Sequence, residues 1–90
     1  MTRDNLIKQI QVVINLLELE INTRDRKKGV YKELYTKYLQ AKQCLINEEP
    51  YTNVRIIGSV RYFIDSSREE NYVLINEMGK AEDILKYLSQ

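Results

Sequence analysis

The sequence predicts an all-α fold, a small four-helix bundle packed around an apolar N-terminal helix. Residues 6–21 contain ten large aliphatic side chains in sixteen positions, without Gly or Pro. Apolar side chains recur at helical spacing in later segments, and the connections between these segments are short and polar. We therefore expect one domain over residues 1–90, with helices at roughly 4–22, 30–47, 53–65 and 68–88. The alternative is an α+β fold in which residues 54–75 form a short antiparallel sheet.

The first helix is too apolar to lie alone on a surface. At 100° per residue its aliphatic side chains spread over roughly 240°, whereas an amphipathic helix needs a stripe somewhat wider than 100°. Other helices or a second chain must therefore cover both of its flanks. Val12, Leu16 and Leu19 are the candidates for contact with a partner.

The second helix has a core stripe and a more polar shoulder. Tyr31, Tyr35 and Leu39 lie on this shoulder, where a tyrosine can bury its ring and still extend its hydroxyl to water or to a partner. Pro50 ends the helix because proline cannot continue the hydrogen-bond ladder. The stripe, spaced at 4, 4, 3 and 4 residues, consists of Val30, Leu34, Tyr38, Ala41 and Leu45.

Residues 53–65 fit two patterns. As strands they are rich in β-branched and aromatic residues, and Gly58-Ser59 could form the turn of a hairpin. As a helix they gather their apolar side chains on one face, which agrees with the helical neighbours, and we favour this interpretation. The predicted face consists of Ile56, Ile57, Val60, Phe63 and Ile64.

The last helix is predicted to begin near residue 68. Ser66 and Ser67 stand three residues before Glu69 and Glu70, the spacing of a capping box. Gly79 inside the helix predicts a kink, a break or the close approach of another helix. The repeat at 4, 3, 4 and 3 residues consists of Leu74, Met78, Ala81, Leu85 and Leu88.

Composition excludes most enzyme classes. The chain has 43% hydrophobic and 30% charged residues with a mean hydropathy of −0.47, typical of a soluble globular protein, and we expect it to be cytoplasmic. It lacks histidine, the commonest general base and a usual metal ligand, and its one cysteine, Cys44, excludes an internal disulfide. Adjacent acidic pairs such as Glu82-Asp83 diverge on a helix. We predict no catalytic residue, no metal and no cofactor.

Basic residues are concentrated in one segment. Residues 24–42 hold seven of the 14 lysines and arginines although the net charge is only +1. Arg24, Arg26, Lys27 and Lys28 are the candidate anion-binding residues, and a weak nucleic-acid-binding regulator is therefore one alternative function.

The function that we favour from the sequence is a non-enzymatic protein-interaction or regulatory module. Its partner would be another protein or a second copy of the chain, without involvement of a membrane. The contact residues would be the three aliphatic side chains of the first helix and the three shoulder residues of the second. The abundance of Ile, Lys, Asn and Tyr indicates a low-GC bacterium or its phage, which suggests an immunity or inhibitor protein as a further alternative.

Overall fold

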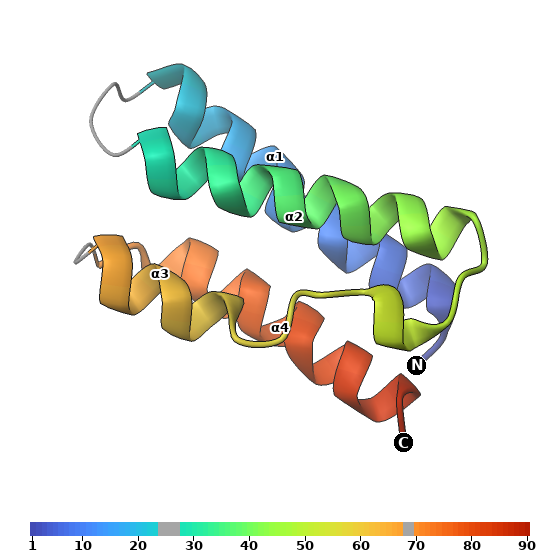
Figure 1. Cartoon of the computed structure of the whole chain (residues 1–90). Coiled ribbons are helices and arrows are strands. Elements are labelled where there is room, and N and C mark those ends of the chain that lie inside the picture. Colours follow the sequence, from blue (N-terminus) through green and yellow to red (C-terminus); the bar gives the residue numbers. More distant parts are fainter. Residues whose placement is uncertain (24–27, 68–69) are drawn as a thin grey trace.

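The fold is all-α, as predicted. The computed structural model describes residues 1–23, 28–67 and 70–90. Their elements are α1 (Arg3–Thr23), α2 (Lys28–Ile46), a short 3-10 helix η1 (Tyr51–Asn53), α3 (Ser59–Ser67) and α4 (Tyr72–Leu88) (Figure 1). No strand occurs among these described residues, so the alternative with a sheet in 54–75 is wrong for the part of it that is described.

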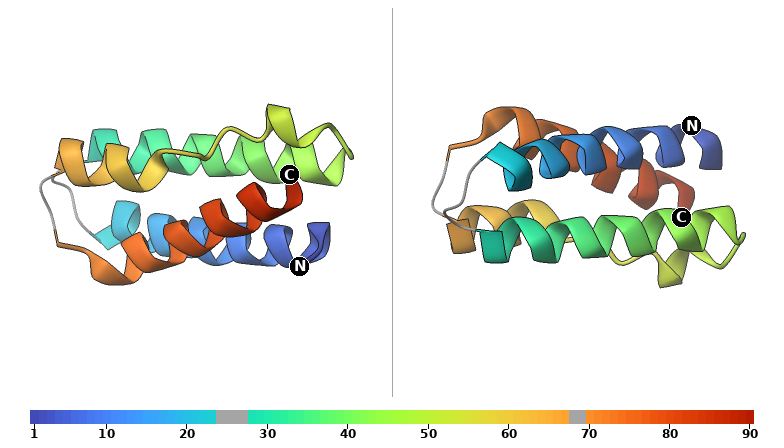
Figure 2. Two further views of the ribbon diagram at one scale, coloured as in Figure 1. Left: turned by 90° about the horizontal axis from the view of Figure 1, so that it is seen from below. Right: turned by 90° about the horizontal axis from the view of Figure 1, so that it is seen from above.

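The helices form two layers in an elongated bundle of 35 × 20 × 17 Å. α2 and α3 lie on one side and α1 and α4 on the other (Figure 2). α1 and α2 form an antiparallel hairpin, and α1 packs on both α2 and α4 (Figure 1). α3 contacts α2 and α4, which places it diagonally across the bundle from α1.

The core is a continuous cluster to which all four α-helices contribute. Tyr38, Phe63 and Met78 are among its fully buried side chains. α1 and α2 each supply five residues of this cluster, and α1 packs on both α2 and α4, which agrees with its predicted place at the centre of the fold. The buried residues of α1 are Leu6, Ile10, Val13, Ile14 and Leu17.

The predicted helix over residues 53–65 begins too early. Residues 54–56 lie outside any helix and form an extended segment, since Val54 has extended backbone angles and Val54 and Ile56 are buried while Arg55 between them is exposed. Ile57 and Gly58 form a turn. Gly58 then has a φ of 92°, a left-handed conformation that favours glycine, and α3 starts at the next residue.

The apolar face predicted for this helix is therefore only partly correct. Ile57 and Ile64 are half-exposed, whereas Ile56 and Phe63 enter the core as predicted. Ile56 reaches the core from the extended segment and Phe63 reaches it from α3. The predicted face assumed one continuous helix, but the backbone changes conformation at Gly58.

The start of α4 also differs from the prediction. Asn71 caps this helix, because its Oδ1 accepts a hydrogen bond from the backbone N–H of Leu74 at 3.2 Å. Ser67 is instead the last residue of α3, where its hydroxyl donates to the carbonyl of Phe63. Gly79 lies inside α4 without dividing it, and apart from its own helix backbone and chain neighbours nothing lies within 4 Å of the Cβ that another residue would place there.

Candidate functional site

An apolar stripe faces outward from α1. Val12 and Leu19 are 41% and 58% exposed, and Leu16 between them is half-buried against the core. Side chains spaced by four and three residues lie on the same side of a helix. We call Val12, Leu16 and Leu19 the outer face of α1.

Polar contacts on both sides of α1 fix the direction of this face. On the α4 side, the Gln9 amide donates to the Glu77 carbonyl at 3.0 Å and to its carboxylate at 2.9 Å. On the α2 side, Lys42 donates to the Gln11 side chain and the Tyr35 hydroxyl to the Glu18 carboxylate at 3.2 Å. The outer face of α1 therefore lies between its two neighbours and points to solvent.

The shoulder residues of α2 fall into two groups. Leu39 is 40% exposed and Tyr35 is half-buried beside α1, so both are accessible. Tyr31 is buried, and its ring meets that of Phe63 edge-on at 5.6 Å between centroids. The prediction that Tyr31 belongs to an exposed contact surface is wrong, because α3 covers this side of α2.

The predicted anion-binding residues are not available for comparison with the structure. Arg24, Arg26 and Lys27 lie outside the described residues, as does the side chain of Lys28, the first residue of α2. Anion binding by this segment stays a prediction.

A buried polar cluster joins α2, α3 and α4. The Glu82 carboxylate of α4 accepts hydrogen bonds from the backbone N–H groups of Gly58 and Val60, at 3.0 and 2.9 Å. It also accepts one from the Ser59 hydroxyl at 3.0 Å. Because that hydroxyl proton points to Glu82, the Tyr38 hydroxyl of α2 donates to Ser59 at 2.6 Å. The hydroxyl protons of Tyr38 and Ser59 thus each have a defined acceptor.

This cluster holds the beginning of α3 in place. The first N–H groups of a helix have no intrahelical acceptor and carry a partial positive charge, which a carboxylate stabilises. Ser59 and Glu82 are only 4% and 8% exposed, so the cluster connects the helices and does not face a substrate.

The sequence predicted that the side chains of Glu82 and Asp83 diverge, and Asp83 is exposed, but the burial of Glu82 was not predicted. The spacing in the sequence indicates this burial, since Glu82 stands four residues after Met78 and three before Leu85, both on the core stripe.

The cluster predicts a loss of stability at alkaline pH. Burial raises the pKa of Tyr38 well above its usual range, and the negative charge of Glu82 raises it further. The folded state therefore holds the Tyr38 proton more strongly than the unfolded chain does. The contribution of this protonated hydroxyl to the free energy of unfolding is complete below about pH 10, the ordinary pKa of tyrosine. Above that pH the contribution falls by up to about 1.4 kcal/mol per pH unit.

Urea denaturation from about pH 9 to about pH 11 would measure this loss. The Tyr38→Phe variant should be less stable at neutral pH but lose less stability as the pH rises. Equal pH slopes for the two proteins would contradict the assignment to Tyr38.

The described residues offer neither a metal site nor a membrane span. Among residues 1–23, 28–67 and 70–90, no group of acidic or cysteine side chains could hold a metal ion. Within the same ranges, none of the helices has the length and apolar character needed to cross a membrane.

The fold and its surfaces define a small all-α bundle protein that exposes an apolar stripe on its central helix. The model of a family described as "YeeD uncharacterised protein" matches residues 1–90, and the chain belongs to this family. Neither a curated protein nor a solved structure matches the chain.

Proposed function

We propose that this protein is a non-enzymatic protein-binding module that contacts its partner through the outer face of α1. The observation that carries the proposal is the exposure of Val12 and Leu19 on a helix whose remaining aliphatic side chains are buried or half-buried. Single exposed apolar residues are common on protein surfaces, but two exposed side chains with the half-buried Leu16 between them form one stripe on the central helix, a contact surface of the helix-in-groove type.

The surroundings of the stripe suit such a contact. Lys8, Asn15 and Glu18 are exposed on the same helix and would provide a polar rim around the apolar centre. Leu39 on α2 extends the apolar surface beyond α1, since Tyr35 and Lys42, on either side of it, both contact α1. The partner is a protein with a complementary apolar groove or helix, and a second copy of this chain is one such protein.

The test compares two double variants with the unchanged protein. Val12→Lys/Leu19→Lys places charges on the outer face of α1, and Ile57→Lys/Ile64→Lys places equal charges on apolar residues of similar exposure elsewhere. Both variants should fold, because exposed substitutions usually change stability by less than about 0.5 kcal/mol. Sedimentation velocity across the micromolar range measures self-association, and affinity capture from the native host followed by binding measurements with the purified protein identifies another partner.

We expect association that survives in the Ile57/Ile64 variant and is lost in the Val12/Leu19 variant. The proposal would be overturned if the unchanged protein and both variants were monomeric and captured the same host proteins.

A further inference from the structure

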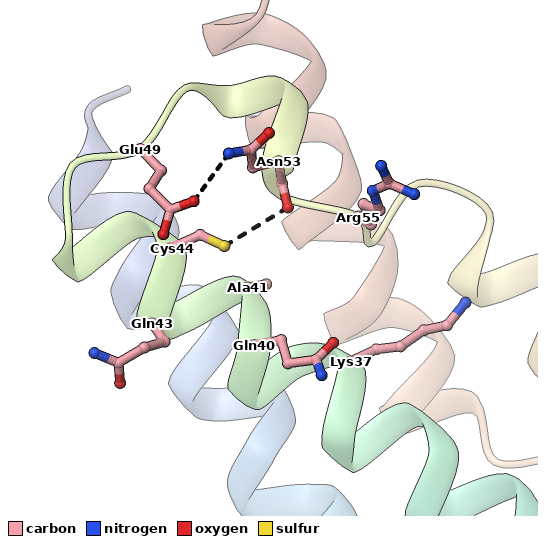
Figure 3. Close-up of a pocket in the computed structure, with 8 residues that line it drawn as sticks. All are labelled: Lys37, Gln40, Ala41, Gln43, Cys44, Glu49, Asn53 and Arg55. Carbon is pink, nitrogen blue, oxygen red and sulfur yellow. Dashed lines mark hydrogen bonds between the residues drawn. The ribbon is translucent and has the colours of Figure 1, made fainter.

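A pocket of about 590 Å³ lies between α2 and the segment around η1 (Figure 3). Its size is within the range of small-ligand pockets. Ala41 and Cys44 supply the less polar part of its lining, while Lys37, Gln40 and Arg55 supply polar groups. By helical position, Lys37 and Cys44 lie on the side of α2 away from the residues that contact α1, so the pocket is separate from the outer face of α1.

One wall of the pocket is held by side-chain hydrogen bonds. The Cys44 thiol donates to the carbonyl of Asn53 at 3.7 Å, and the Asn53 amide donates to the Glu49 carboxylate at 2.9 Å (Figure 3). These contacts attach η1 to the end of α2. Glu49 is the acidic residue of the lining, and its carboxylate accepts this hydrogen bond from a neutral amide and not from a cation.

Two cations reach the same side of this pocket from different elements. Lys37 extends from α2 and Arg55 from the extended segment (Figure 3). Arg55 is directed outward because Val54 and Ile56, on either side of it, are buried. Among the residues that the structure describes, neither cation forms an ion pair or donates a hydrogen bond.

The charge of Lys37 is not neutralised by its neighbours on α2 and α3. Its ammonium lies 5.8 Å from the centroid of the Tyr62 ring, a contact that keeps the charge. Glu33, one helical turn earlier, accepts a hydrogen bond from the Tyr62 hydroxyl instead of pairing with Lys37. The pocket thus combines a concave surface with two cations that form no ion pair among the described residues.

We propose that this pocket binds a small molecule through a phosphate or carboxylate group held between Lys37 and Arg55. The planar guanidinium can donate two parallel hydrogen bonds to either group, and the lysine ammonium adds a point charge. The Gln40 side chain offers a neutral donor beside them. This site is independent of protein binding by α1.

The first test is a titration of the protein with inorganic phosphate and, separately, with succinate, followed by amide chemical shifts. Shifts should concentrate at residues 37–44 and 53–55, with dissociation constants in the millimolar range for such small probes. The variant Lys37→Gln/Arg55→Gln should bind about tenfold more weakly, the lower end of what a focused charged cleft contributes. The control variant Arg61→Gln/Lys80→Gln has the same net charge, changes exposed residues outside the pocket and should bind like the unchanged protein.

Cys44 provides a second readout at the site, because it is the one cysteine of the chain. Cys44 should react faster with an anionic aromatic disulfide reagent than with a neutral one. The ratio of these two rates should be about tenfold higher in the unchanged protein than in the Lys37/Arg55 variant. Saturating phosphate should suppress this preference. Unaltered shifts with both anions, or equal effects of the two double variants, would overturn the proposal.

A short single-stranded oligonucleotide distinguishes a free ligand from a polymer that presents phosphates. Binding of phosphate or succinate that is confined to the pocket, without tighter binding of the oligonucleotide, supports the small-molecule assignment. Tighter oligonucleotide binding with shifts spread along α2 would overturn it in favour of a nucleic-acid surface.

Discussion

Replacing Glu82 with alanine should lower the free energy of unfolding by about 3 kcal/mol. The substitution removes the acceptor of two backbone N–H groups, those of Gly58 and Val60, and of the Ser59 hydroxyl. A buried donor left without a partner costs about 1–3 kcal/mol, and some of these donors will recover water as the start of α3 loosens. The loss also removes a negative charge from the positive end of that helix.

Chemical denaturation followed by circular dichroism measures this effect, and the chain offers a matched control. Asp83 is the neighbouring acid on α4 but is exposed, so Asp83→Ala should change the stability by less than about 0.5 kcal/mol. Glu82→Gln should lie between the two, because its amide keeps one acceptor oxygen and loses the charge. Similar losses for Glu82→Ala and Asp83→Ala would show that the buried cluster does not hold α3.

The long helices could be predicted from the sequence because their information is local. In α1 and α2 the apolar side chains recur at helical spacing without interruption, and a short polar connection makes the two helices antiparallel. The same periodicity along α4 gave its buried stripe correctly, with Leu74, Met78 and Leu85 in the core.

The beginning of α3 could not be predicted in this way, because a distant residue helps to determine it. Residues 53–65 satisfy a helical pattern, yet the carboxylate that accepts the first N–H groups of α3 comes from Glu82, more than twenty positions along the chain. Gly58 permits the left-handed backbone there, but a glycine alone does not reveal that the preceding residues are extended. The tertiary contact decides between two locally acceptable conformations.

The surfaces show the same division between local and long-range information. The wide apolar arc of α1 predicted that other helices or a second chain must cover both of its flanks, and the helices of this chain leave Val12 and Leu19 exposed. Tyr31 was predicted to be exposed, but it is buried by Phe63 of α3, and the sequence does not show that α3 packs on this side of α2. The pocket combines residues of α2 with Asn53 and Arg55, and no sequence pattern relates these positions.

The second large effect is expected at the centre of the bundle, where Leu17→Ala should lower the free energy of unfolding by about 3–4 kcal/mol. Leu17 is fully buried in the core cluster. Truncating a buried leucine loses its transfer free energy and leaves a cavity, which together cost about 2–5 kcal/mol. Leu17 is held between helices on both sides of α1, so the surroundings have little freedom to close the space.

Leu19→Ala is the matched control, since it makes the same chemical change two residues further along α1 at a side chain that is 58% exposed. Its stability should change by less than about 1 kcal/mol, because little apolar surface returns to water. Denaturation curves of both variants, compared with the unchanged protein, separate the two roles of α1. If Leu19→Ala destabilised the bundle as strongly as Leu17→Ala, Leu19 would be part of the core, and the outer face of α1 would not be free to bind a partner.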